Sequence, residues 1–225
     1  MLILAIETST ISCSVALVAD GKLLAEHTTQ NSRNHSVALL PNVIQLLSEQ
    51  SVEQSAISAI AVGIGPGSFT GLRIGLATAK ALAYALKIPL IGVPTMRTLF
   101  LQAKDCAEYI IPVIDAQQGN VYLAVYGVDG ECSEVAVVAK TDLPKLVKTA
   151  DSYCFCGEIT AEIKAIMSGV ANAAFVATEI SLPRAEYTGI AAQYMFSRKM
   201  FSDINTLEPI YIRKSAAEEL LERSK

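Results

Sequence analysis

The chain repeats one order of predicted elements after about 105 residues, and this duplication limits the fold more than any other feature. In each copy an apolar run ends in a carboxylate, a hairpin follows, and an Asp-Gly pair makes the next turn. Glu7 and Asp115, the two carboxylates, are 108 positions apart, and the turn glycines Gly21 and Gly130 are 109 apart. The order therefore predicts two copies of one folding unit.

Each copy is predicted to begin with three antiparallel strands, which alternating helices and strands follow. In the first copy we expect strands at 2–6, 12–18, 23–29, 59–64 and 90–93 and helices at 36–49, 69–86 and 95–103. In the second we expect strands at 110–114, 121–128, 134–138, 153–156 and 174–177 and helices at 142–150, 159–167 and 184–201. Such a unit forms a mixed sheet flanked by helices. We expect an α/β protein with halves at 1–104 and 105–225, and leave open whether 209–213 and a helix at 215–223 return to the first half.

Composition excludes several classes of protein. Apolar residues make up 52% of the chain and charged residues 18%, which argues against a disordered protein. The formal net charge of −4 argues against an independent nucleic-acid-binding module. A surface with so few charges also indicates that a partner covers part of it.

The apolar segments do not predict a membrane protein. The first run has no basic residue ahead of it and meets Glu7 almost at once, which is unlike a signal peptide. The longest apolar tract, 74–93, is interrupted by Lys80, Lys87 and Pro89, so it does not fit a membrane-spanning helix. We expect a soluble, cytoplasmic chain.

The cysteines and histidines do not predict a metal site. The five cysteines have irregular spacing, and Cys154 and Cys156 lack the second pair that a zinc site needs. Buried, reduced thiols in a strand are the favoured interpretation. The two histidines, His27 and His35, come without an acidic or cysteine cluster, and we expect ordinary surface or capping roles for them.

A glycine-rich segment at 63–75 is the most specific motif in the chain. It lies between a predicted strand and a predicted helix, where backbone N–H groups can hold an anion. It is not a phosphate-binding P-loop, because no Gly-Lys-Ser/Thr follows, and its glycine spacing does not fit a dinucleotide site. The alternative is a sharp turn with Ser68 or Thr70 capping the helix. The motif's central residues are Gly65, Pro66, Gly67, Ser68, Phe69, Thr70 and Gly71.

The two longest predicted helices of the first half are apolar around most of their circumference. Between 71 and 86 only Arg73 and Lys80 carry charge. In the helix at 36–49, Leu39 and Leu46 lie off the main apolar stripe. That stripe consists of Val37, Leu40, Ile44 and Leu47. Helices that are apolar on two faces are buried on two sides, so we expect them to form an interface.

These motifs together resemble the bacterial TsaB (YeaZ) family over essentially the whole chain. The resemblance is carried by 1–10, the glycine motif at 65–75, 114–116 with 119–122, and 209–213. It implies the duplicated actin, Hsp70 and sugar-kinase-like fold, whose halves are ribonuclease H-like.

The resemblance also implies a function in tRNA modification. Family members take part in making threonylcarbamoyladenosine beside the anticodon of tRNAs that read codons beginning with A. TsaD, a paralogue, transfers the threonylcarbamoyl group, TsaB pairs with TsaD and is required for its activity, and the ATPase TsaE docks on the pair. The metal motif of TsaD, His-x-x-x-His, is absent from 94–102. We therefore expect a non-catalytic scaffold or activator subunit that binds no cofactor alone, with ATP and metal on its partners and tRNA handled only through the complex.

The two strand-end carboxylates fit a degenerate phosphate site. Active members of the superfamily have Asp and a glycine-containing hairpin, whereas this chain has Glu7 followed by Thr8-Ser9-Thr10. The extra methylene moves the carboxylate by about 1.5 Å, which disturbs a site that needs octahedral magnesium. Asp115 is likewise followed by a segment without the paired glycine. We expect both acids to accept hydrogen bonds at strand ends and no independent ATP hydrolysis.

We expect the two apolar helices to dock on TsaD, or on a second copy when TsaD is absent. The expected contacts are Leu40, Ile44, Leu72, Leu76 and Ala79, with Arg73 at the rim. Periodicity leaves open which helix face points outward. The alternative functions are a metallopeptidase-like or sugar-kinase-like ATPase and an independent tRNA-binding module, and the missing metal cluster, the altered hairpins and the acidic charge argue against them.

Overall fold

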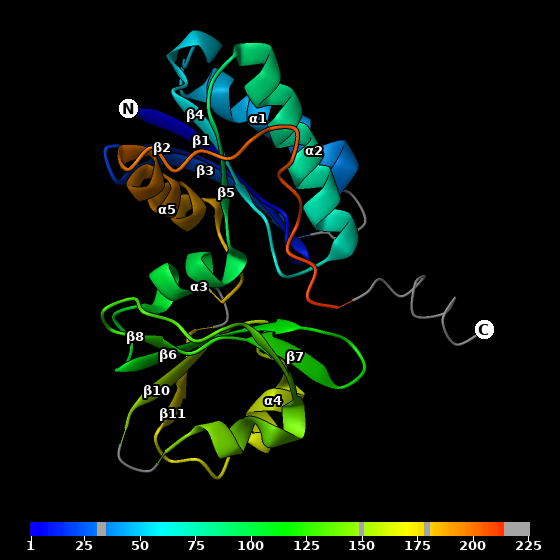
Figure 1. The fold of residues 1–225 in the computed structure, drawn as a ribbon, viewed down its shortest axis with the longest axis vertical. Helices are drawn as coiled ribbons and strands as arrows, with labels where there is room; N and C mark the ends of the chain where they lie inside the picture. The colour runs from blue at the N-terminus through cyan, green and yellow to red at the C-terminus, as the bar shows by residue number, and fades with distance from the viewer. Residues whose placement is uncertain (31–34, 149–150, 178–180, 214–225) are drawn as a thin grey trace, which may run out of the picture.

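The protein contains two mixed β-sheets flanked by helices (Figure 1). The computed structural model describes residues 1–30, 35–148, 151–177 and 181–213. The predicted α/β class is confirmed. The helix predicted at 215–223 lies outside the described residues.

The first sheet has the strand order β3-β2-β1-β4-β5. Its strands are β1 (Leu2–Glu7), β2 (Ser12–Ala19), β3 (Lys22–Gln30), β4 (Ala59–Gly63) and β5 (Leu90–Val93). The first three pair antiparallel, and β1, β4 and β5 pair parallel. One face is covered by α1 (His35–Glu49) and α2 (Phe69–Leu86), and a short 3-10 helix, η2 (Gln54–Ala56), precedes β4. Every residue of β4 is buried, as expected for a strand covered on both faces.

The second sheet repeats this topology with the order β11-β10-β6-β7-β9. Its strands are β6 (Tyr109–Asp115), β7 (Asn120–Leu123), β9 (Ala136–Ala139), β10 (Tyr153–Gly157) and β11 (Ala173–Phe175), and β8 (Tyr126–Gly127) also pairs with β6. The segment predicted as one strand at 121–128 is thus divided into β7 and β8. A 3-10 helix, η3 (Lys140–Leu146), replaces most of the helix predicted at 142–150, and α4 (Ala161–Ile166) follows β10. The matching strand orders confirm the duplication.

Two helices are exchanged between the halves. The helix of the first copy, α3 (Thr95–Ala103), buries Met96, Leu99 and Phe100 against the second sheet. The helix of the second copy, α5 (Ala185–Ser197), packs on the first sheet through its alanines. The expectation that a helix at 184–201 completes the second half is therefore wrong. An apolar face predicts that a helix is buried, but it does not specify which of two similar sheets it covers.

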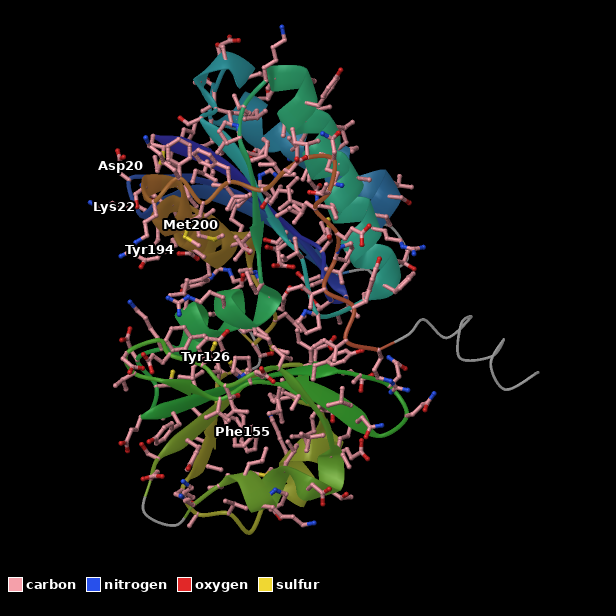
Figure 2. The ribbon with its side chains drawn as sticks, viewed as in Figure 1. Asp20, Lys22, Tyr126, Phe155, Tyr194 and Met200 are labelled. Carbon is pink, nitrogen blue, oxygen red and sulfur yellow. The ribbon has the colours of Figure 1, made fainter. Side chains whose placement is uncertain are left out.

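Aromatic side chains fill the second half. Phe155 of β10 is fully buried in the core beside α4, and Figure 2 shows it inside this half. Tyr126 lies on the other side of the sheet, where its ring stacks on Phe100 of α3 with centroids 4.6 Å apart. These contacts attach α3 to the second sheet.

Candidate functional site

A cleft of about 470 Å³ lies between the halves, where the hairpin after β1, the glycine turn and the hairpin after β6 meet. The end of the described chain forms a further wall. The residues that line the cleft include Ser9, Thr10, Gly67, Ser68, Asp115, Gln117, Gln118, Glu158, Tyr211 and Arg213. The duplicated sheets thus bring the segments after both strand-end acids to one place.

The glycine motif forms the turn between β4 and α2. Gly65 has a φ of 99°, a conformation that other residues rarely adopt. The hydroxyl of Ser68 accepts a hydrogen bond of 3.2 Å from the N–H of Gly71, so Ser68 caps α2. The N–H of Ser68 donates to the carbonyl of Ser9 at 2.6 Å. The start of α2 is therefore fixed to the hairpin that follows β1.

Three glycines of the motif let α2 approach this hairpin closely. A Cβ atom on Gly67 would overlap the carbonyl of Ser9, and one on Gly71 would overlap the carbonyl of Thr8. A Cβ atom on Gly75 would overlap the Oγ1 atom of Thr8. That hydroxyl donates a hydrogen bond of 2.9 Å to the carbonyl of Gly71. The glycines thus form a surface that packs on the hairpin.

The carboxylate of Glu7 is buried away from the cleft. Its Oε1 atom accepts a hydrogen bond of 3.0 Å from the N–H of Ser9, and its Oε2 atom accepts one of 3.0 Å from the hydroxyl of Thr188. Burial raises the pKa of Glu7, although these hydrogen bonds oppose the shift. The Glu7 side chain is one methylene longer than that of Asp, and its hydrogen bond to Thr188 joins β1 to α5.

Asp115 lies at the cleft, where Lys140 and Gln117 already contact its carboxylate. Its Oδ1 atom is 3.7 Å from the Nζ atom of Lys140, and its Oδ2 atom accepts a hydrogen bond of 2.8 Å from Gln117. The N–H of Asp115 donates to Glu158 at 2.8 Å. Burial and the nearby Asp115 charge raise the pKa of Glu158. Sequence reasoning missed Glu158, although an acid directly after the predicted strand at 153–156 and Gly157 could have identified it.

The histidines and cysteines have structural surroundings. His27 pairs with Glu49 at 2.8 Å, and the buried ring of His35 lies 3.1 Å from the carbonyl of Ser12. Cys154 and Cys156 are buried in one core cluster, as free thiols. Within the described residues, no three His, Cys, Asp or Glu side chains are grouped to hold a metal ion. No helix of the described chain has the length and apolarity needed to cross a membrane.

The expected partner contacts divide into two groups. Leu40 and Ile44 on α1 are 47% and 59% exposed. Leu72, Leu76 and Ala79 on α2 are buried in the chain's own core, so the expectation that they contact a partner is wrong. Both faces of α2 are apolar, and the face with the glycines turns inward because it must approach the hairpin.

Exposed apolar residues nevertheless remain on the outward faces of α1 and α2, and together they are here called the α1–α2 surface. It consists of Val37, Leu40, Ile44, Ala77, Ala81 and Tyr84. Arg73 is exposed on the same helix, and its Nε atom donates to the hydroxyl of Tyr211 at 3.1 Å. On α1 the exposed residues belong to the predicted stripe, whereas the off-stripe Leu39 and Leu46 are buried. The structure therefore decides what periodicity left open: the side of α1 with Leu40 and Ile44 points outward, although Leu47 of the same stripe is buried.

The sequence matches characterised relatives along nearly its full length. The family model described as "TsaD: tRNA N6-adenosine threonylcarbamoyltransferase" matches residues 22–221. A protein of Escherichia coli named "tRNA threonylcarbamoyladenosine biosynthesis protein TsaB" is 33% identical, over 96% of both chains. One of the same name from Bacillus subtilis is 32% identical, over 97% of this chain and 96% of the relative. The chain belongs to the TsaB family.

Solved structures agree with this membership. YeaZ from Pseudomonas aeruginosa superposes with a TM-score of 0.76 and 32% identity, over 94% of this chain and 99% of that one. An activator of 2-hydroxyisocaproyl-CoA dehydratase from Clostridium difficile, solved with ADPNP, has a TM-score of 0.56 at 8% identity, over 90% and 99%. It therefore shares the fold alone. The actin, Hsp70 and sugar-kinase-like fold is confirmed for this TsaB family member.

The cleft residues of this TsaB family member do not fit a magnesium nucleotide. The carboxylate of Glu7 is directed to Thr188 and away from the cleft. The backbone of Thr8 is covered by α2, because Gly71 lies directly against its carbonyl. Asp115 already has a lysine neighbour. The first hairpin thus lacks both the free acid and the open backbone that phosphate and magnesium need.

Proposed function

We propose that this chain is a non-catalytic scaffold or activator subunit of the tRNA threonylcarbamoyl transferase. It pairs with TsaD through the α1–α2 surface, and TsaE docks on the pair. TsaD then transfers the threonylcarbamoyl group to the adenosine beside the anticodon of tRNAs that read codons beginning with A. ATP and metal belong to the partner subunits, and tRNA is bound only by the complex.

The observation that carries this proposal is the apolar α1–α2 surface on a TsaB family member. Val37 and Tyr84 are 72% and 77% exposed, on two helices that pack side by side. Large exposed apolar side chains on neighbouring elements are typical of a surface that a partner covers. A groove of about 640 Å³ continues from this surface between the two helices. Its lining includes Leu40, Ile44, Leu47, Leu82 and Leu86.

The same surface accounts for a homodimer when TsaD is absent. Two copies of one helix pair form the simplest two-fold arrangement, since an isologous contact uses the same patch on both chains. TsaD and the second copy then compete for one surface. We expect added TsaD to convert the homodimer to a heterodimer.

The geometry of the cleft argues against the alternative of an ATPase or metallopeptidase. Glu7 is engaged by Ser9 and Thr188, and burial of its carboxylate opposes the charge that a magnesium ligand carries. Saturable ATP turnover by the purified chain, lost in Glu7→Ala, would favour the enzyme instead.

Matched leucine substitutions test the interface. Leu40 is 47% exposed on α1, and Leu24 is 51% exposed on β3, outside both helices. We expect Leu40→Glu to abolish the TsaD complex on size-exclusion chromatography and Leu24→Glu to preserve it. Both variants should keep the wild-type melting temperature, because both positions accept a charge in water. Equal binding by the two variants contradicts the assigned surface.

Reconstitution tests the function itself. Purified TsaD and TsaE, with tRNA and the threonylcarbamoyl donor, should modify tRNA in the presence of this chain and fail without it. With Leu40→Glu, tRNA modification should be as low as when the chain is left out, and with Leu24→Glu it should equal that of the wild type. Full modification without the chain would contradict an activating role.

A further inference from the structure

Residues 202–213 form a strap that covers the open edge of the first sheet. The N–H of Ser202 donates to the carbonyl of Leu90 at 2.8 Å, and its hydroxyl accepts from the N–H of Gly92 at 3.1 Å. Leu207 then lies over Gly92, where an added Cβ atom would come within 3.1 Å of it. Figure 1 shows this segment in orange, beside β5 and α2. The strap thus pairs with the edge strand and continues toward the cleft.

The next residues attach the strap to the start of α2. The N–H of Ile210 donates to the carbonyl of Ile64 at 2.7 Å. The ring of Tyr211 stacks on Phe69 with centroids 4.5 Å apart. The guanidinium carbon of Arg73 lies 4.0 Å from the centre of the Phe69 ring, and its Nε atom donates to the Tyr211 hydroxyl. Stacking and cation–π contact each stabilise this position.

Arg213 then crosses to the second half. Its Nη1 atom donates to the carbonyl of Ala116 at 2.7 Å, and its Nη2 atom donates to the Oε1 atom of Gln118 at 3.3 Å. These acceptors belong to the turn between β6 and β7. Gln117 and Gln118 have φ values of 63° and 54° there, in the left-handed region that non-glycine residues rarely adopt. The planar guanidinium has several donors in fixed directions, which suits this turn.

We propose that the strap is a latch between the two halves, in which Arg213 sets the opening of the cleft. The cavity is lined by Ser9 and Gly67 from the first half, by Asp115 and Gln118 from the second, and by Arg213 itself. When Arg213 holds the β6–β7 turn, the second half is fixed to the first turn of α2, because only Ile212 separates Arg213 from Tyr211, which stacks on Phe69. Release of Arg213 frees the second half to rotate about α3 and α5.

The latch also links the cleft to α2, the helix that carries part of the α1–α2 surface. Tyr211 contacts Phe69 and Arg73 in the first two turns of that helix. Any ligand or partner that favours one cleft opening therefore changes the same contacts that hold α2. This second consequence rests on the proposed function, whereas the latch itself does not.

Paired spin labels on the full chain test the latch directly. Ser48→Cys on α1 and Lys164→Cys on α4 are exposed positions in the two halves, and Cys106→Ser and Cys132→Ser remove the exposed native thiols. In this background we expect Arg213→Ala to lengthen and broaden the distance distribution measured by electron resonance. Amide exchange at 116–119 should rise in parallel. Arg213→Lys keeps the positive charge and an ammonium donor but loses the planar guanidinium, and it should lie between wild type and Arg213→Ala.

Arg198→Ala is the matched control, since it also removes an arginine side chain but not one that lines the cleft. Its guanidinium lies 4.5 Å from the ring of Tyr194, at the edge of the first half far from the cleft (Figure 2). It should leave the distance distribution unchanged. An unchanged distribution in Arg213→Ala, or equal broadening in Arg198→Ala, would overturn the latch. The two proposals fail separately: an unchanged distribution in Arg213→Ala refutes the latch whether or not TsaD binds, whereas failure of the wild-type chain to bind TsaD contradicts the proposed function and leaves the latch measurement valid.

Discussion

The hydroxyl of Thr188 donates a hydrogen bond of 3.0 Å to the carboxylate of Glu7, which is 181 positions earlier in the chain. Thr188 also lies 3.0 Å from the hydroxyl of Thr98 on α3. All three side chains are fully buried. The acid that ends the first strand therefore joins the two helices exchanged between the halves.

Replacing Glu7 with Gln should stabilise the protein near neutral pH. Burial raises the pKa of Glu7 in the folded state above its ordinary value of about 4.3. Folding therefore favours the protonated acid, and the stability that this acid contributes is lost as pH rises through the folded pKa. The amide of the variant does not titrate, so Glu7→Gln should be more stable than wild type at pH values above the ordinary pKa of the acid.

Urea unfolding at several pH values measures this difference. The gain should be smallest below the ordinary pKa of Glu, should grow as pH rises toward the folded pKa, and should then level off. Glu7→Ala, which leaves Thr188 and the N–H of Ser9 without their acceptor, should instead lose about 2–4 kcal/mol at low pH, where Glu7 is protonated. A pH-independent difference for Glu7→Gln would contradict the assigned pKa direction.

The five thiols of the native protein should differ in their rate of reaction with Ellman's reagent, according to how deeply each is buried. Cys106 and Cys132 are exposed, whereas the other three cysteines are buried. Burial raises the pKa of Cys13 to about 11 and that of Cys154 to about 12, which removes the reactive thiolate at neutral pH. We expect two fast thiols in the native state and five after unfolding in urea. A third fast thiol would show that a core strand opens.

The sequence predicted the topology well because the repeat is a long-range signal. Matching acids and turn glycines placed both three-stranded units, and the strand, turn and cap around Ser68 followed from local chemistry. Orientation was harder to predict. Leu39 and Ile44 are both apolar, and only packing on the sheet decides that Leu39 is buried and Ile44 is 59% exposed. The direction of Glu7 likewise depends on Thr188, whose position relative to β1 no local pattern encodes.

Glu26 should be essential for holding α5 on the first sheet. Its buried carboxylate accepts hydrogen bonds from Arg184 at 2.8 Å, from the N–H of Glu186 at 3.0 Å and from the hydroxyl of Ser14 at 2.8 Å. These groups supply a helix cap from β2 and β3, since α5 has no side-chain cap of its own. Glu26→Ala should therefore lose about 1–3 kcal/mol, because it leaves the N–H of Glu186 without its acceptor and removes one of the two carboxylates that pair with Arg184.

Thermal unfolding of two variants distinguishes the capping role of Glu26 from a general effect of removing a negative charge. The control variant lacks a different carboxylate. Glu49→Ala removes an exposed carboxylate that pairs with His27, and its melting temperature should stay at the wild-type value. Glu26→Ala should melt several degrees lower. Equal melting temperatures for the two variants would refute the capping role of Glu26.

A double-mutant cycle should show that Gly75 is required by Thr8 and not by backbone freedom. A Cβ atom at position 75 would overlap the Oγ1 atom of Thr8, while its contacts to the other Thr8 atoms are ordinary ones of 3.4 and 3.6 Å. Gly75→Ala should lose about 1–3 kcal/mol through overpacking. Thr8→Ala should lose about 1 kcal/mol with its hydrogen bond to Gly71. Because the second change removes the overlapping atom, the double variant should lose less stability than the sum of the two single losses, by at least about 1 kcal/mol.

Gly169→Ala, whose added Cβ atom would meet no other atom within 4 Å, supplies the control. Its effect on the free energy of unfolding should simply add to that of Thr8→Ala. Chemical denaturation of these variants measures the coupling energy, and a value near zero would mean that α2 tolerates a side chain against the hairpin.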